Sequence, residues 1–151
     1  MTSDVKSAAL RFLKIRPRSV FELTEKLRGK GFETAAIDEV VEGLIKSKLL
    51  NDRVFADAWI RYRLARPFGF VRIVREFKEK GISADIIETS VLNARIEYIE
   101  SDVLLDLARR KALRLSDVPA EKRNKRIFDF LIRRGFKVDD AYKAIKKLGN
   151  V

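Results

Sequence analysis

The residues of this chain that could do chemistry are cations, because the usual catalytic side chains are missing. The 151 residues include no cysteine and no histidine, which excludes thiol nucleophiles, disulfides and the commonest metal ligand and general base. The glycine-rich segment 28–32 lacks the Gly-Lys-Ser/Thr ending of a phosphate-binding loop. The carboxylate pairs Glu97/Glu100 and Asp139/Asp140 have no histidine beside them, so we interpret them as solvated helix charges. We therefore expect a non-enzymatic protein without a metal or a cofactor.

Lysine and arginine give the chain its chemical character. They number 33 against 22 aspartates and glutamates, so the net charge is +11 and the pI is about 10.1. This excess favours a polyanionic partner, which is nucleic acid, an acidic protein surface or an anionic membrane. Arginine suits such a partner because its planar guanidinium binds a carboxylate or a phosphate through paired hydrogen bonds. Solvated surface charge is the alternative interpretation of any single cluster.

The candidate partner-binding residues are the arginines that cluster along the sequence. Arg72 and Arg75 lie three residues apart, and Arg110 and Arg114 lie four apart, so each pair can reach one polyanion from one helix face. The complete set is Arg61, Arg63, Arg66, Arg72, Arg75, Arg109, Arg110, Arg114, Arg123, Arg126, Arg133 and Arg134.

Aromatic side chains offer two interpretations, as stacking platforms for single-stranded bases or as core residues. Phe12 and Trp59 lie on apolar helix stripes, so we expect both in the core. Tyr62 and Phe68 fit either role.

Three ten-residue segments align without a gap and end alike. They cover residues 23–32, 73–82 and 127–136. In each, two apolar residues four positions apart are followed by a basic residue, a glycine and another apolar residue. This pattern predicts a helix that ends in a left-handed C-cap at Gly31, Gly81 and Gly135. Apolar residues six and ten positions after each glycine predict a second helix, so the repeat is a helical hairpin.

A further helix-like stretch precedes each hairpin. These stretches cover about residues 4–15, 52–66 and 101–115. Each repeat then has three helices, and the repeats cover residues 1–50, 51–98 and 99–151, with charges of +3, +2 and +6. No segment alternates apolar and polar residues between turn dipeptides, so the class is all-α. We expect the three repeats to stack as a short curved solenoid that leaves a long surface for a partner.

Helix start signals agree with these boundaries. Ser19 with Glu22 has the pattern of a capping box, and Asn51 or Asp52 is the expected cap of the helix that carries Trp59. No apolar run approaches the roughly 20 residues that span a bilayer, and the first residues lack the layout of a signal peptide. We expect a cytoplasmic protein that has no membrane partner.

Several of these motifs also occur, in the same order, in a known family. The chain reads RSVFELTEKL at 18–27, KGF at 30–32, LLNDRVFADAWIR at 49–61, GFVRI at 69–73, KGI at 80–82 and IRRGF at 132–136. This ordered set resembles the RecX family of bacterial recombination regulators. The resemblance covers nearly the whole chain and is looser in the third repeat.

The resemblance implies a fold of three tandem three-helix repeats, each similar to a helix-turn-helix. It implies binding to the RecA recombinase filament on single-stranded DNA, in the groove of the filament, with damping of ATP hydrolysis and strand exchange and a place in DNA repair and the SOS response. No catalysis is involved, and the protein is expected to be a monomer. Among the candidate arginines, only Arg61 and Arg72 fall on matching motifs.

Three points stay open at the level of sequence. They are the direction of the effect on the recombinase, the face that docks, and direct binding of free single-stranded DNA. An autonomous DNA-binding protein is the alternative function, since a basic chain of helix-turn-helix-like repeats fits that role as well. An enzyme that relies on Asp, Lys, Ser or Tyr alone is a third alternative.

Overall fold

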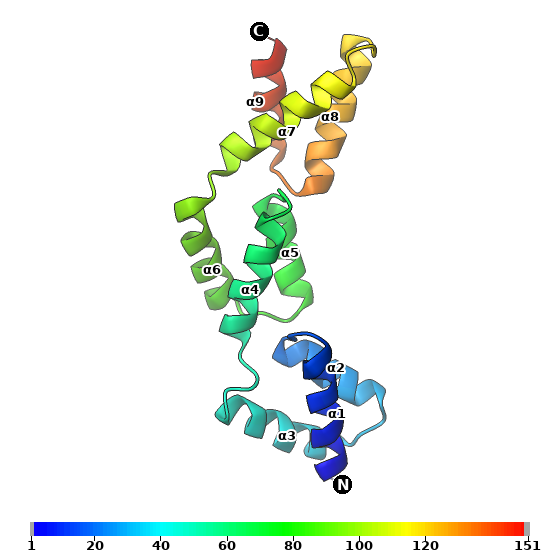
Figure 1. The fold of residues 1–151 in the computed structure, drawn as a ribbon, viewed down its shortest axis with the longest axis vertical. Coiled ribbons are helices and arrows are strands. Elements are labelled where there is room, and N and C mark those ends of the chain that lie inside the picture. Colours follow the sequence, from blue (N-terminus) through cyan, green and yellow to red (C-terminus); the bar gives the residue numbers. More distant parts are fainter. Residues whose placement is uncertain (1, 150–151) are drawn as a thin grey trace. The chain divides into compact units, whose positions relative to one another are not determined.

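The computed structural model describes residues 2–149, and over this range it contains nine α-helices and no strand (Figure 1). In chain order the helices are α1 (Thr2–Ile15), α2 (Val20–Gly29), α3 (Thr34–Lys46), α4 (Asp52–Leu64), α5 (Phe70–Glu79), α6 (Ala84–Glu97), α7 (Glu100–Arg114), α8 (Ala120–Arg134) and α9 (Val138–Gly149). The predicted all-α class is confirmed. The stretches predicted before the three hairpins correspond to α1, α4 and α7. None of the helices within residues 2–149 is both long and apolar enough to cross a membrane.

The chain forms two compact units. Unit 1 comprises Met1–Trp59 and Phe77–Ser90, and unit 2 comprises Ile60–Glu76 and Val91–Val151. The helices α1 to α3 therefore belong to unit 1, and α7 to α9 belong to unit 2. Each unit has its own buried core.

The core of unit 1 is built where α1, α2 and α3 pack on one another. Ala9 of α1, Leu23 and Leu27 of α2 and Ile37 of α3 are almost completely buried. Their spacing within each helix places them on one face, as the apolar pattern predicted. Phe12 is partly buried and packs against the edge of this cluster, in agreement with the predicted packing role.

The core of unit 2 is built where α7, α8 and α9 pack on one another (Figure 1). Ala108 of α7, Ile127 and Leu131 of α8 and Ala141 of α9 are buried. The small residues of this core, Ala108 and Ala141, are completely buried. The last predicted hairpin thus closes on the helix that precedes it.

The three repeat glycines adopt the left-handed conformation that the sequence predicts. Their φ angles are +86° at Gly31, +69° at Gly81 and +94° at Gly135. After the second and third glycines the chain turns back on the helix. The N–H of Ile82 donates to the carbonyl oxygen of Phe77 at 3.0 Å, and the N–H of Phe136 donates to that of Leu131 at 3.2 Å, in each case five residues earlier. Both of these apolar residues are buried, so the turn adds a hydrophobic contact to the cap.

The predicted helix starts are also confirmed. The Ser19 hydroxyl accepts from the N–H of Glu22 at 3.1 Å, and the Glu22 carboxylate accepts from the N–H of Ser19, which completes the capping box. Of the two candidates at the start of α4, Asn51 is the cap. Its Oδ1 accepts from the N–H groups of Arg53 and Val54 at 2.9 and 3.2 Å.

The start of α2 is joined to two later segments within unit 1, in contacts that we call junction 1. The Ser19 hydroxyl donates to the carbonyl oxygen of Lys80 at 2.7 Å. The N–H of Val20 donates to Oδ1 of Asp52 at 2.8 Å. Asp52 therefore accepts a tertiary hydrogen bond, and burial raises its pKa although that bond works in the opposite direction.

The start of α5 is joined to the end of α8 within unit 2, in contacts that we call junction 2. The N–H of Gly69 donates to the carbonyl oxygen of Arg134 at 2.8 Å, and the N–H of Val71 donates to that of Gly135 at 3.0 Å. Gly69 and Ser19 are equivalent, since each stands 12 residues before the left-handed glycine of its own repeat. In junction 2 the free backbone donors of a helix start meet the free acceptors of a helix end, whereas in junction 1 the Ser19 hydroxyl is the donor to a helix end and the Asp52 carboxylate accepts the free N–H of Val20.

The same two junctions leave no room for a side chain at their glycines. A Cβ on Gly81 would lie 2.4 Å from the Cβ of Phe21 in unit 1, and a Cβ on Gly135 would lie 2.2 Å from the Cβ of Arg72 in unit 2. The equivalent direction at Gly31 is open, with no atom within 4 Å. The glycines are thus required for close packing at two of the three positions and for backbone conformation at all three.

Glu100 is not the solvated helix charge that we expected. It is the first residue of α7, and its carboxylate accepts a hydrogen bond from the N–H of Phe70 at the start of α5. Burial raises its pKa. Asp52, the first residue of α4, has the same relation to Val20. The interpretation was wrong because the partner of this carboxylate comes from another repeat.

The Glu22 carboxylate neutralises cations at junction 1. It pairs with Arg16 and lies 3.5 Å from the ammonium of Lys80. Burial works to raise its pKa, but the hydrogen bonds from Arg16 and from the N–H of Ser19, with the charge of Lys80, outweigh burial and lower the pKa. A lowered carboxylate pKa means a stabilisation that is present above its ordinary value near 4.5 and is lost as the pH falls through the folded-state pKa.

We expect Glu22→Gln to reduce the free energy of unfolding by about 1–2 kcal/mol at neutral pH, because charge-assisted hydrogen bonds are lost. The difference from the unsubstituted protein should shrink in acid, where Glu22 is protonated in both states. Urea denaturation followed by circular dichroism, from neutral pH into the acid range, measures both effects. A difference that stays constant as the pH falls would contradict the assigned charge of Glu22.

Candidate anion-binding site

Four of the predicted arginines line one hollow in unit 2, of about 780 Å³. Its walls are formed by Ala65, Arg66, Pro67, Phe68, Arg72, Phe130, Arg133 and Arg134. These residues come from the segment that follows α4, from α5 and from the end of α8. Among the described residues that line it, half are arginines and none is acidic, so we call it the arginine hollow.

Phe68 is the centre of the arginine hollow. Three guanidinium groups lie over its ring, with Cζ-to-centroid distances of 4.4 Å for Arg72, 4.9 Å for Arg134 and 5.1 Å for Arg63. The ring attracts these cations because the face of an aromatic ring is electron-rich. Tyr98 holds Phe68 in place, since its hydroxyl donates to the Phe68 carbonyl oxygen at 3.0 Å.

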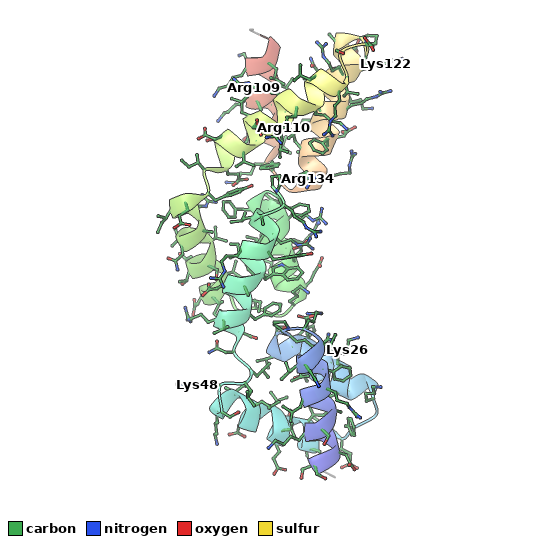
Figure 2. All side chains as sticks on the ribbon, viewed as in Figure 1. Lys26, Lys48, Arg109, Arg110, Lys122 and Arg134 are labelled. Carbon is green, nitrogen blue, oxygen red and sulfur yellow. The ribbon has the colours of Figure 1, made fainter. Side chains whose placement is uncertain are left out.

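The second ring of the hollow is Phe130 on α8. The Cζ of Arg134 lies 5.5 Å from its centroid, and the ammonium of Lys111 lies 5.0 Å from it. Arg134 therefore bridges the two rings. Figure 2 shows this arginine at the end of α8.

Glu76 fixes two of the arginines from inside unit 2. Its carboxylate accepts from Nε of Arg63 at 2.8 Å and from Nε of Arg72 at 3.1 Å, and Glu76 is only 8% exposed. Arg72 also donates from Nη1 to the carbonyl oxygen of Arg133 at 3.3 Å. Arg72 and Arg63 are thus held in place by hydrogen bonds within unit 2.

Arg66 and Arg133 differ from these fixed arginines because both are exposed. The guanidinium of Arg66 lies 5.1 Å from the ring centroid of Tyr62, which is itself 48% exposed. The hydrogen-bonded guanidinium group of Arg72 and the exposed ones of Arg66 and Arg133 thus line the same hollow. A site of this kind can bind an oxyanion, since each guanidinium offers two parallel donors to a carboxylate or a phosphate.

The other predicted arginines lie outside the hollow. Arg61 and Arg75 are exposed on α4 and α5. Arg123 and Arg126 lie on the first half of α8. The structure therefore brings together part of the predicted set.

Three further predicted arginines are carried by α7. They are Arg109, Arg110 and Arg114, and all three are exposed. Figure 2 labels the first two. Arg110 pairs with Asp106 at 2.9 Å, one turn away on the same helix. An exposed pair of this type contributes little to stability, so α7 presents its positive charge to solvent.

The sequence reasoning missed Glu76 and Phe130 and left Phe68 open. Glu76 had a detectable signal, because it stands four residues after Arg72 and can pair with it on a helix. Phe130 had none, since an aromatic residue on α8 is equally compatible with a place in the core.

Comparison with known proteins places the chain in a family. Three family models match in order along the sequence, described as the first, second and third three-helix domains of RecX, at residues 6–44, 51–90 and 99–145. The chain belongs to the RecX family. The predicted arrangement of three tandem three-helix repeats is thereby confirmed, while the boundaries placed at residues 50 and 98 stay a prediction.

Relatives in the RecX family span most of the chain. The regulatory protein RecX of Halorhodospira halophila is 32% identical over 145 residues, which cover 93% of this chain and 85% of that protein. That of Clostridium perfringens is also 32% identical, over 96% of this chain and 68% of the relative. Membership of this family gives the chain a regulatory role.

Solved structures of the RecX family share the fold. The crystal structure of RecX from Lactobacillus salivarius has a TM-score of 0.82 and 25% identity, and the match covers 99% of this chain and 97% of that one. A second crystal structure of a regulatory protein RecX has a TM-score of 0.80 and 20% identity, over 97% of this chain and 71% of that one. The second similarity supports the fold alone.

Proposed function

We propose that this protein modulates a RecA recombinase by binding the RecA filament on single-stranded DNA. Membership of a regulatory family supports a partner protein, and the ordered motifs at 18–61 and 69–82 supported the same assignment from sequence. The observation that carries the proposal is the arginine hollow, which is lined by two partly buried arginines, Arg72 and Arg134, and two exposed ones, Arg66 and Arg133. The protein acts as a cytoplasmic monomer and makes its contacts through this surface and through the exposed arginines of α7, Arg109, Arg110 and Arg114.

A bound regulator can act on the filament without doing chemistry. If it contacts the filament in one conformation better than in another, it shifts the population towards that conformation by the difference in binding free energy. A filament that is held in one conformation of its ATPase cycle hydrolyses ATP more slowly and exchanges strands less efficiently. Inhibition is therefore the direction that we propose.

Addition of this protein to RecA filaments on single-stranded DNA should slow ATP hydrolysis and strand exchange, at amounts below one protein per RecA subunit. A coupled ATPase assay and a strand-exchange gel measure the two activities. The control is RecA alone with an equally basic, unrelated protein, which separates specific action from competition for DNA. If an excess of this protein leaves both activities unchanged, the proposal is wrong.

A second candidate function is direct DNA binding, which the net charge of +11 favours. Binding of this type releases counterions, so the affinity should fall steeply with salt concentration. Sequence-specific affinity that persists at physiological salt would favour this function over filament regulation. Weak affinity without sequence preference fits a regulator that uses DNA to find the filament.

A further inference from the structure

Junctions 1 and 2 are built alike, but they carry opposite charge at one equivalent position. Glu22 and Arg72 both stand nine residues before the left-handed glycine of their own repeat. Lys80 and Arg134 are equivalent too, because each directly precedes the glycine of the repeat that joins on. Junction 1 therefore places a carboxylate beside a cation, whereas junction 2 places an arginine beside an arginine.

The contacts bear out this difference. In junction 1 the carboxylate of Glu22 lies 3.5 Å from the ammonium of Lys80. In junction 2 the guanidinium groups of Arg72 and Arg134 share the ring of Phe68, at 4.4 and 4.9 Å from its centroid. Like charges that share one ring repel each other, and the Glu76 carboxylate, 3.1 Å from Nε of Arg72, offsets this repulsion on the Arg72 side. Electron density of the ring offsets part of that repulsion, and an external anion would offset more.

We propose that the arginine hollow binds an acidic segment of a partner protein, whose carboxylates pair with Arg134 as Glu22 pairs with the equivalent cation Lys80 in junction 1. Junction 1 is an example of this pairing within the same protein, because Lys80, the equivalent of Arg134, already lies beside the carboxylate of Glu22. This inference rests on the proposed function in that the partner is a protein. It adds the class of ligand and the residues that bind it.

The geometry favours a carboxylate-bearing peptide over single-stranded nucleic acid. Proteins that bind single strands stack bases on open aromatic faces. Here Phe68 is only 8% exposed and carries three guanidinium groups, and Phe130 carries Arg134 and Lys111. Cations already occupy the ring faces on which bases would stack. The apolar walls at Ala65 and Pro67 suit the aliphatic parts of a peptide.

Arg66 and Arg133 are the residues with which to test the site. Both line the hollow and are exposed, so their side chains can be reversed without removing the pairs that hold Arg72. The matched control reverses Arg11 and Arg53, which are exposed in unit 1 and change the net charge by the same amount. Thermal melting of all variants checks that the fold is intact.

The probes are a fluorescein-labelled Glu-rich peptide and a labelled oligo(dT) of equal formal charge, measured by fluorescence anisotropy. We expect R66E/R133E to weaken peptide binding at least about tenfold, the loss that one or more charge-assisted hydrogen bonds would cause. R11E/R53E should weaken it only slightly. Oligo(dT) affinity should fall equally in both variants, because DNA responds to net charge. The peptide affinity of R66K/R133K should lie between those of the unsubstituted protein and R66E/R133E, since lysine keeps the charge but not the paired donors.

Two outcomes would overturn the inference. One is a loss of peptide affinity that is equal in the hollow variant and the control variant. The other is a loss of oligo(dT) affinity confined to R66E/R133E, which would make the hollow a nucleic-acid site. Failure of the proposed function is a separate result: the protein would leave RecA ATP hydrolysis unchanged while the peptide still bound at the hollow.

Discussion

Replacing Gly135 with alanine will unfold unit 2 at temperatures at which the Gly31→Ala variant is still folded. Both glycines have a positive φ, and forcing an L-residue into that conformation costs about 1–2 kcal/mol. At Gly31 the new Cβ meets no atom within 4 Å, so the cost ends there. At Gly135 the Cβ would lie 2.2 Å from the Cβ of Arg72 and 2.7 Å from its backbone nitrogen. These atoms can move only if junction 2 opens, which raises the total to roughly 4 kcal/mol or more.

The third glycine supplies the intermediate case. A Cβ on Gly81 would meet the Cβ and ring of Phe21, which is 48% exposed and can shift towards solvent. Melting temperatures should therefore fall in the order Gly31→Ala, Gly81→Ala, Gly135→Ala, and Gly81→Val should be worse than Gly81→Ala. Circular dichroism melts measure the series. Equal melting temperatures for the three alanine variants would show that the positive φ alone causes the loss of stability, and that the close contacts at Gly81 and Gly135 add nothing to it.

Glu76→Gln should have the second largest effect, a loss of about 3 kcal/mol in the free energy of unfolding. The substitution removes the charge that pairs with Arg63 and Arg72 while leaving both guanidinium groups partly buried beside each other. Breaking a buried ion pair from one side typically costs 3–5 kcal/mol, and the partial exposure of the two arginines reduces this value. Urea denaturation of the variant, followed by circular dichroism, measures the loss.

Glu88→Gln is the matched control, because Glu88 is an exposed glutamate on α6 and its substitution changes the net charge equally. Its free energy of unfolding should stay within about 0.5 kcal/mol of the unsubstituted protein. Equal losses in the two variants would mean that net charge, rather than the pairs with Arg63 and Arg72, explains the effect of Glu76.

The helices and their caps were predictable because they depend on residues close together in the sequence. The spacing of Leu23 and Leu27 specifies a helix face, and a glycine placed after that face specifies where the helix ends. The capping box of Ser19 and Glu22 spans one turn. Such local signals recur in each repeat, so each one reinforces the others.

The arginine hollow was predictable only in part, because it is assembled from distant segments. Clustering along the sequence identified the arginines but could not show that Arg66 and Arg134 face one space. The pair of Arg72 with Glu76 was detectable from its spacing, but the bond to the Arg133 carbonyl was not. Because of both bonds, Arg72 is a poor choice for a charge reversal that should spare the fold. Asp52 and Glu100 illustrate the same limit, since a carboxylate that accepts a tertiary hydrogen bond has the same sequence appearance as a solvated one.

The close contact between Gly69 and Gly135 has a consequence for the evolution of the repeats. A Cβ on Gly69 would lie 2.3 Å from the carbonyl oxygen of Gly135, and a Cβ on Gly135 would meet the start of the helix that follows Gly69. A side chain gained at either position must therefore be matched by a change in another repeat, which a single substitution cannot provide. Selection should hold both positions at glycine together, while exposed positions of the repeats can change one at a time; the net charges of the three repeats differ, at +3, +2 and +6.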